Sequence, residues 1–95
     1  FKMKTIGRSV KLSTHNLPGT FMMETKVFAD SNMECQKAVL HTHQGTASNV
    51  FYLRPEDVEK IMNNPEHFIQ TFKKSLQPLL TGEPLFLQEE LEPNS

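Results

Sequence analysis

The sequence RPEDVEKIMNNPEHFIQTFKKSLQPLL, residues 54–80, decides the fold. In its second half, apolar residues follow one another at gaps of one, three, four and four: Phe68, Ile69, Phe72, Leu76 and Leu80. This repeat places side chains on one face of an α-helix. An apolar face of that length has to pack against another part of the chain, and the strand-rich residues before Arg54 are the candidate partner.

The same stretch contains the signals for two helices rather than one. Pro55 suits the first position of a helix, and the two acidic residues after it lie at the positive end of the helix dipole. Pro65 disfavours a helical conformation at the preceding Asn64, so the helical pattern is interrupted there. We therefore predict one helix at 55–63 and a second at 65–80.

The residues before Arg54 alternate in the way that strands do. Residues 20–29 show a period of two, and a change of phase at Gly7 within residues 2–13 indicates a bulge. Short connections imply antiparallel neighbours, because a parallel return needs a crossover of a dozen or more residues. The predicted strands are 2–13, 20–29, 35–43 and 50–53, with turns or loops at 16–19, 30–32 and 44–49.

These patterns predict an α+β fold: an antiparallel sheet of about four strands in a meander, followed by two C-terminal helices packed on one face. The 95 residues suffice for a single domain at 1–82, with an acidic and apolar tail at 83–95 that is docked or partly disordered. No stretch approaches the roughly 20 apolar residues of a membrane span. With one cysteine and no initial methionine, the chain is expected to be a domain of a larger intracellular protein, cytoplasmic or nuclear.

The sequence contains no pattern typical of catalysis or of metal binding. A nucleophile elbow, a phosphate-binding glycine loop and a metalloprotease motif are all missing, so neither an enzyme nor a cofactor is expected. His41 and His43 share one face of a predicted strand, but Cys35 lies about 20 Å away along an extended strand. A structural zinc site usually has paired ligands at both ends of its spacing. The two histidines are therefore expected to be half-exposed surface residues.

Two apolar groups favour a protein partner. Met22 and Phe28 fall on the face of the predicted strand 20–29 that lies opposite the core, where an apolar pair suits a partner surface. The tail places apolar residues among carboxylates, a composition that docks as a short helix or strand: Leu85, Phe86, Leu87 and Leu91. An open sheet also has unpaired edges, which makes a homodimer a further expectation. The favoured prediction is a non-enzymatic, regulatory protein–protein interaction domain.

The alternative prediction is a small nucleic-acid-binding module that uses a basic sheet face. Its basic residues are Lys2, Lys4, Arg8, Lys11 and Lys26. If these residues converge on one open face with Phe28, the alternative gains; if they scatter, it loses. Residues 1–19 contain no acid, whereas 83–95 contain four glutamates and no base, so the tail is also a candidate to cover a basic surface.

The entry into the first predicted helix, Leu53-Arg54-Pro55-Glu56, follows a run of strands. In this respect the chain is similar to the single-stranded-DNA-binding transcriptional coactivators. The resemblance covers one strand-to-helix junction, and no functional residue is transferred from it.

Overall fold

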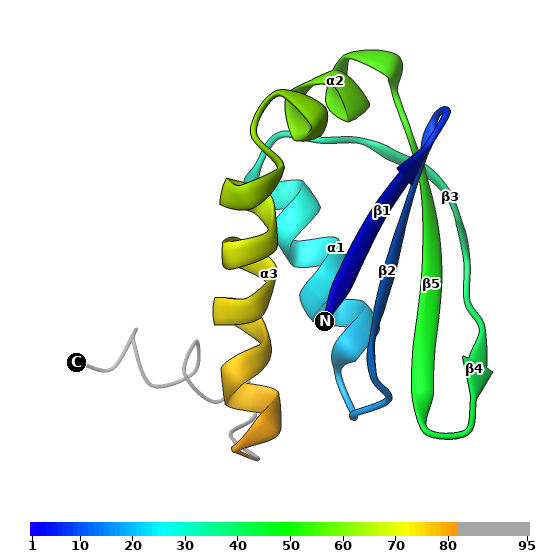
Figure 1. Ribbon diagram of the computed structural model, residues 1–95, viewed down its shortest axis with the longest axis vertical. Helices are drawn as coiled ribbons and strands as arrows, with labels where there is room; N and C mark the ends of the chain where they lie inside the picture. The colour runs from blue at the N-terminus through cyan, green and yellow to red at the C-terminus, as the bar shows by residue number, and fades with distance from the viewer. Residues whose placement is uncertain (82–95) are drawn as a thin grey trace, which may run out of the picture.

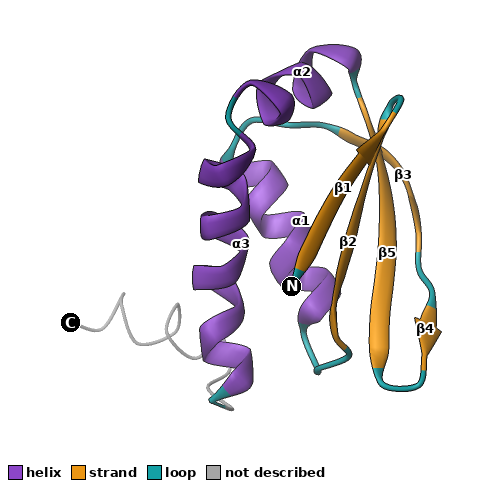
Figure 2. Ribbon diagram, viewed as in Figure 1, coloured by secondary structure: helices purple, strands orange, loops and turns teal. Residues whose placement is uncertain are grey.

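The computed structural model describes residues 1–81, which form three helices and one five-stranded antiparallel sheet (Figures 1 and 2). In chain order the elements are β1 (Lys2–Ile6), β2 (Ser9–His15), α1 (Thr20–Asp30), β3 (Cys35–Val39), β4 (Thr42–His43), β5 (Thr46–Leu53), α2 (Pro55–Asn63) and α3 (Pro65–Leu80). The predicted α+β fold, an antiparallel sheet with helical cover, is confirmed. The tail residues predicted to contact a partner lie outside the described residues: Leu85, Phe86, Leu87 and Leu91.

The first two strands form a hairpin, whereas the sequence pattern predicts one strand over 2–13. Gly7 has a φ of +60°, a left-handed conformation that glycine adopts without steric cost, and the chain reverses over Gly7 and Arg8. Lys4 consequently lies opposite Lys11 on the neighbouring strand. The change of phase at Gly7 therefore marks a turn and not a bulge.

Residues 20–29 are helical, so the prediction of a strand there is wrong. α1 buries five side chains that fall on one helical face: Thr20, Met23, Glu24, Val27 and Phe28. The helix ends in a Schellman motif, in which Asn32 has a φ of +59° and the Met33 N–H donates to the Phe28 carbonyl at 2.9 Å. This helical phase buries Phe28 in the core and leaves Met22 at the surface, so the two do not share an exposed face.

The insertion of α1 changes the connectivity of the sheet. β2 and β3 both pair antiparallel with β5, so they run parallel to each other on either side of β5, and α1 is the crossover between them. The strand order is β1-β2-β5-β3, with β4 also paired to β5, and this order differs from a meander. The predicted strand 35–43 is divided into β3 and β4, and β5 begins at Thr46 rather than at residue 50.

The core lies between the sheet and the helices, which gather on one side of it (Figure 1). An aromatic cluster joins the layers: the Phe28 ring of α1 lies 4.9 Å from that of Phe51 on β5 and 5.4 Å from that of Phe72 on α3. The bounds of α2 and α3 agree with the predicted helices 55–63 and 65–80. The apolar face of α3 is therefore buried against the layer that precedes it, as the helical repeat predicts.

Candidate functional site

The face of the sheet that points away from the helices is open (Figure 2). Residues on β2 and β5 alternate between buried side chains, which face the helices, and side chains that are partly or fully exposed. No described element packs on the exposed set. This outward face is an uncovered surface of the sheet, and its residue types decide what it can bind.

Four lysines lie on the outward face. Lys11 projects away from the core because both its neighbours in β2 are buried. Lys4 is the partner of Lys11 on β1, and Lys2 has the same parity as Lys4. Lys37 on β3 is the partner of Tyr52, whose neighbours in β5 are likewise buried. We call these four lysines and the surface around them the lysine face.

No acidic residue balances these charges within the described strands. None of the five strands in residues 1–81 contains Asp or Glu, since the seven acids of this part of the chain lie on the helices and in a connection. Lys4 and Lys11 lie directly opposite each other, a pairing in which like charges are destabilising. An anion bound between them would remove that repulsion. The positive charge of the lysine face therefore favours the binding of a negatively charged ligand.

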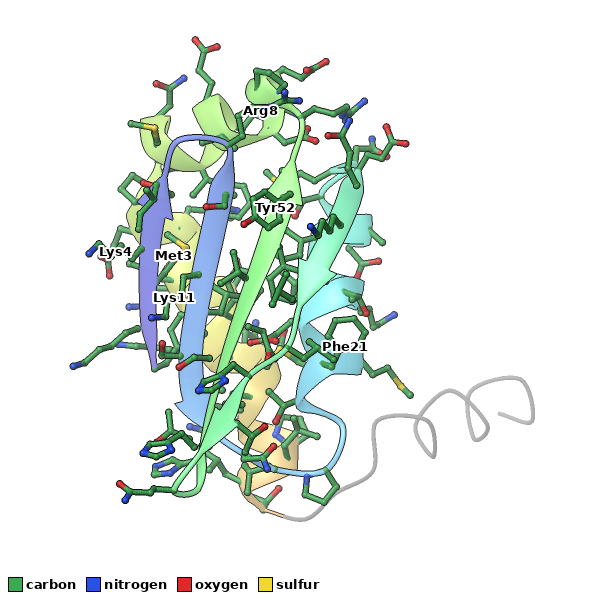
Figure 3. The ribbon with its side chains drawn as sticks, turned by 90° about the vertical axis from the view of Figure 1, so that its right-hand side faces the viewer. Met3, Lys4, Arg8, Lys11, Phe21 and Tyr52 are labelled. Carbon is green, nitrogen blue, oxygen red and sulfur yellow. The ribbon has the colours of Figure 1, made fainter. Side chains whose placement is uncertain are left out.

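An aromatic ring lies among the lysines. Tyr52 is 39% exposed, and the Lys37 Nζ lies 5.6 Å from the centre of its ring. Figure 3 shows Lys4, Lys11 and Tyr52 on the same side of three neighbouring strands, with Arg8 at the end of the sheet. The Arg8 guanidinium donates to Gln36 Oε1 at 3.4 Å. The face thus combines exposed lysines with an exposed tyrosine ring.

The basic residues predicted for a nucleic-acid site are only partly brought together. Lys2, Lys4 and Lys11 share the lysine face. Lys26 does not, because it lies on α1, where its Nζ is 3.9 Å from Asp30 Oδ2. Phe28 was predicted to lie beside these lysines if the protein bound nucleic acid, but it is buried. Lys37 joins the group only through the long-range pairing of β3 with β5, which no local pattern reveals.

A hollow of about 220 Å³ lies between the start of α1 and the β4–β5 end of the sheet. Its lining is mixed: Asn16, Leu17, Gly19, Thr20, Phe21, Met22, Leu40, Thr42, Ala47 and Asn49. Met22 and Leu40 are 60% and 56% exposed at its rim. Figure 3 shows Phe21 on α1 beside the β3 edge of the sheet. Met22, predicted to contact a partner, therefore lines a hollow of mixed polarity instead of a flat strand face.

Asn49 connects this hollow to a buried carboxyl group. Its Nδ2 donates to Glu24 Oε1 at 2.8 Å, while Glu24 Oε2 is buried and has no hydrogen-bond partner within residues 1–81. Burial raises the pKa of Glu24 from 4.5 to about 7, and the Asn49 hydrogen bond opposes that rise only in part. A strand at 20–29 would place Glu24 opposite the core, so the sequence pattern gave no indication of this buried acid.

The histidines predicted to be surface residues are exposed, and the rings of His41 and His43 stack with centroids 6.4 Å apart. In the part of the chain that the structure describes, no three His, Cys, Asp or Glu side chains are grouped so as to hold a metal ion. Cys35 is exposed, and its thiol donates to the Lys37 carbonyl at 3.3 Å. The candidate sites on the described surface are therefore the lysine face and the hollow.

Comparison with known proteins matches no family model to this chain and finds no similar curated protein. None of the helices within residues 1–81 combines the length and the apolar character needed to cross a bilayer.

Proposed function

We propose that the protein binds single-stranded nucleic acid and that the lysine face is its contact surface. The observation that carries this proposal is the gathering of Lys2, Lys4, Lys11 and Lys37 on an open sheet face whose strands contain no acid. Lysines neutralise a phosphate backbone as mobile point charges, and an aromatic ring among them stacks on a base. Tyr52 has that position on this face.

The shape of the face favours a single strand over a duplex. Proteins read duplex DNA mainly by inserting a helix or a two-stranded ribbon into the major groove. Here the cations lie across a sheet, with Lys11 on the inner strand β2 and the others on the edge strands β1 and β3. A single strand can lie along such a surface with its phosphates near the lysines and one base on Tyr52.

The test is the binding of a labelled oligothymidylate, followed by fluorescence anisotropy at several salt concentrations. Four phosphate contacts predict a slope of log K against log salt of about −3, since each contact on a single strand contributes about −0.7. Lys4→Gln with Lys11→Gln should weaken the slope to about −1.4 and reduce affinity at low salt by about tenfold. Tyr52 is the one tyrosine and the chain has no tryptophan, so intrinsic fluorescence should report the contact directly.

The matched control is Lys73→Gln with Lys74→Gln, which removes the same charge from exposed positions on α3. This pair should change the affinity less than threefold, because it lies on the helical side of the molecule (Figure 1). Equal losses in the two double variants would show that net charge and not the lysine face controls binding. No binding at low salt, either by the unmodified protein or by a variant in which the four glutamates of residues 83–95 are neutralised, would reject the proposal.

A protein contact is the second candidate function, and the hollow is the observation that favours it. The hollow lies where β3 ends, and β3 is an edge strand that pairs only with β5 among the described strands. We propose that this edge pairs with a second copy of the chain, with Leu40 at the contact. An edge strand beside an exposed apolar rim is a surface that proteins use for such pairing.

Self-association should be visible by light scattering over a range of protein concentrations. Leu40→Glu should weaken a dimer by at least about tenfold, because it places a charge at the apolar contact. Met62→Glu is the matched control, since Met62 is 61% exposed on α2, away from this edge. A monomer at all concentrations, or equal weakening by both variants, would exclude the β3 edge as the dimer contact.

A further inference from the structure

The lysine face has a complementary segment within the same chain. Residues 83–95 contain Glu83, Glu89, Glu90 and Glu92 and no basic residue. The same segment contains apolar residues between the acids: Leu85, Phe86, Leu87 and Leu91. The lysine face presents four cations and, between them, exposed apolar groups such as Ile6 and Val39. The segment and the lysine face are therefore complementary in charge, and both contain apolar groups.

The helical side of the molecule does not offer this match. Exposed acids on α1, α2 and α3 are interspersed there with lysines: Asp30, Glu56, Glu59 and Glu66. An acidic segment would meet like charges on that side, and like charges disfavour binding. On the lysine face, by contrast, the described strands contribute no Asp or Glu. Charge therefore selects the sheet side for an acidic segment.

The segment starts close enough to reach this face. Leu79 near the end of α3 lies against the turn that precedes α1, since a Cβ at Gly19 would be 3.2 Å from Leu79 Cδ2. That turn follows His15, the last residue of β2, and Lys2 pairs with Ser13 of the same strand. Thirteen residues span up to about 43 Å when extended. The described part of the molecule measures 42 × 32 × 23 Å, and its helices and sheet lie side by side along the 32 Å direction (Figure 1), which such a length exceeds.

We propose that residues 83–95 of this chain bind the lysine face and compete there with other anions. The competition with nucleic acid rests on the proposed function, whereas the contact itself does not. A tethered segment acts at an effective concentration of about millimolar, so even weak attraction keeps the face partly covered. The bound glutamates would also relieve the repulsion between Lys4 and Lys11.

The experiment compares two variants of the full chain that differ in the place where four negative charges are removed. The tail variant carries Glu83→Gln, Glu89→Gln, Glu90→Gln and Glu92→Gln. The control variant carries Asp30→Asn, Glu56→Gln, Glu59→Gln and Glu66→Gln. We expect the tail variant to bind oligothymidylate about tenfold more tightly than the unmodified chain, and the control variant less than threefold more tightly.

Amide chemical shifts measured without nucleic acid test the contact separately. Neutralising the tail should shift the amides of Lys4, Lys11 and Lys37, whereas neutralising the helices should leave them unchanged. Unshifted face amides, equal affinity gains in both variants, or shifts that vanish on dilution would overturn the intramolecular contact. Shifted amides together with a tail variant that binds no oligothymidylate would support the contact and reject the proposed function.

Discussion

Glu24→Gln should stabilise the protein by about 2 kcal/mol at pH 8 and change its stability little at pH 4.5. Glu24 is fully buried in α1, with one oxygen bound to Asn49 and the other without a partner among the described residues. A carboxylate in that position is destabilised by the loss of water. Glutamine has the same size, carries no charge and retains an oxygen that accepts the Asn49 hydrogen bond.

Proton linkage sets the direction of this effect. The pKa of Glu24 in the folded protein, about 7, lies above its ordinary value of 4.5. The folded state therefore retains a proton that the unfolded state releases between these two values, and the free energy of unfolding falls as the pH rises through that window. Above pH 7 this difference in pKa corresponds to a penalty of about 3 kcal/mol. We expect the measured effect to be about 2 kcal/mol, because the structure around a charged buried group relaxes and admits water. Below pH 4.5 both states are protonated and the penalty is absent.

Urea unfolding of both proteins between pH 4.5 and pH 8 measures the difference directly. The matched control is Glu59→Gln, an exposed acid on α2, which should change stability by less than about 0.5 kcal/mol at each pH. A Glu24→Gln variant that is less stable than the unmodified protein at pH 8 would show that the carboxylate is stabilised in its charged form.

Glu24 also explains where the sequence pattern misled. The segment 20–29 fits a strand with Met23, Thr25 and Val27 inward, and it fits a helix only if Glu24 is inward. Polarity argues against burying a glutamate, so the strand is the local choice. Asn49 leads to a similar misreading of β5, because the polar residues before Val50 suggest a loop although they belong to the strand. The side chains of Glu24 and Asn49 form a hydrogen bond with each other. This long-range contact allows Glu24 to be buried in α1 and Asn49 to be buried in β5.

The helices α2 and α3 were predictable for the opposite reason. Their start signals lie within the segments themselves, at Pro55 and at Asn64-Pro65, and apart from Asp57 their buried residues are apolar at helical spacing. Nothing distant has to be known to place these ends. A proline at the first helical position and the apolar periodicity therefore place this half of the fold locally, while the α1 half depends on partners far away in the sequence.

The lysine face lies between these two cases. The alternation in residues 2–13 could indicate that Lys2 and Lys4 share a face, but Gly7 had to be recognised as a turn before Lys11 could be set opposite Lys4. Lys37 required the β3–β5 pairing, which in turn required α1 to be a crossover helix. The sequence thus shows that the first strands are basic. The gathering of their lysines on one open face follows from the topology of the sheet.

Asp57→Ala should lower the free energy of unfolding by about 3 kcal/mol. Asp57 is fully buried at the start of α2, where Oδ2 accepts from Arg54 Nε at 2.8 Å and from the Glu34 N–H at 3.0 Å. Its Oδ1 accepts from Arg54 Nη2 at 2.9 Å, and that nitrogen also donates to the Asn32 carbonyl. One carboxylate therefore ties α2 to the connection between α1 and β3.

The Arg54 guanidinium holds the pKa of Asp57 below its ordinary value of 3.8, so the stabilisation is complete above that pH and is lost as the pH falls through the lowered value. Asp30→Ala is the control, because Asp30 forms an exposed pair with Lys26 at 3.9 Å and should contribute less than about 0.5 kcal/mol. In an Arg54→Ala background Asp57→Ala should cost clearly less, since the pair is already broken. An unchanged cost in that background would mean that Asp57 acts mainly by accepting from the Glu34 N–H, and α2 would then be anchored by this hydrogen bond between a side chain and the backbone instead of an ion pair.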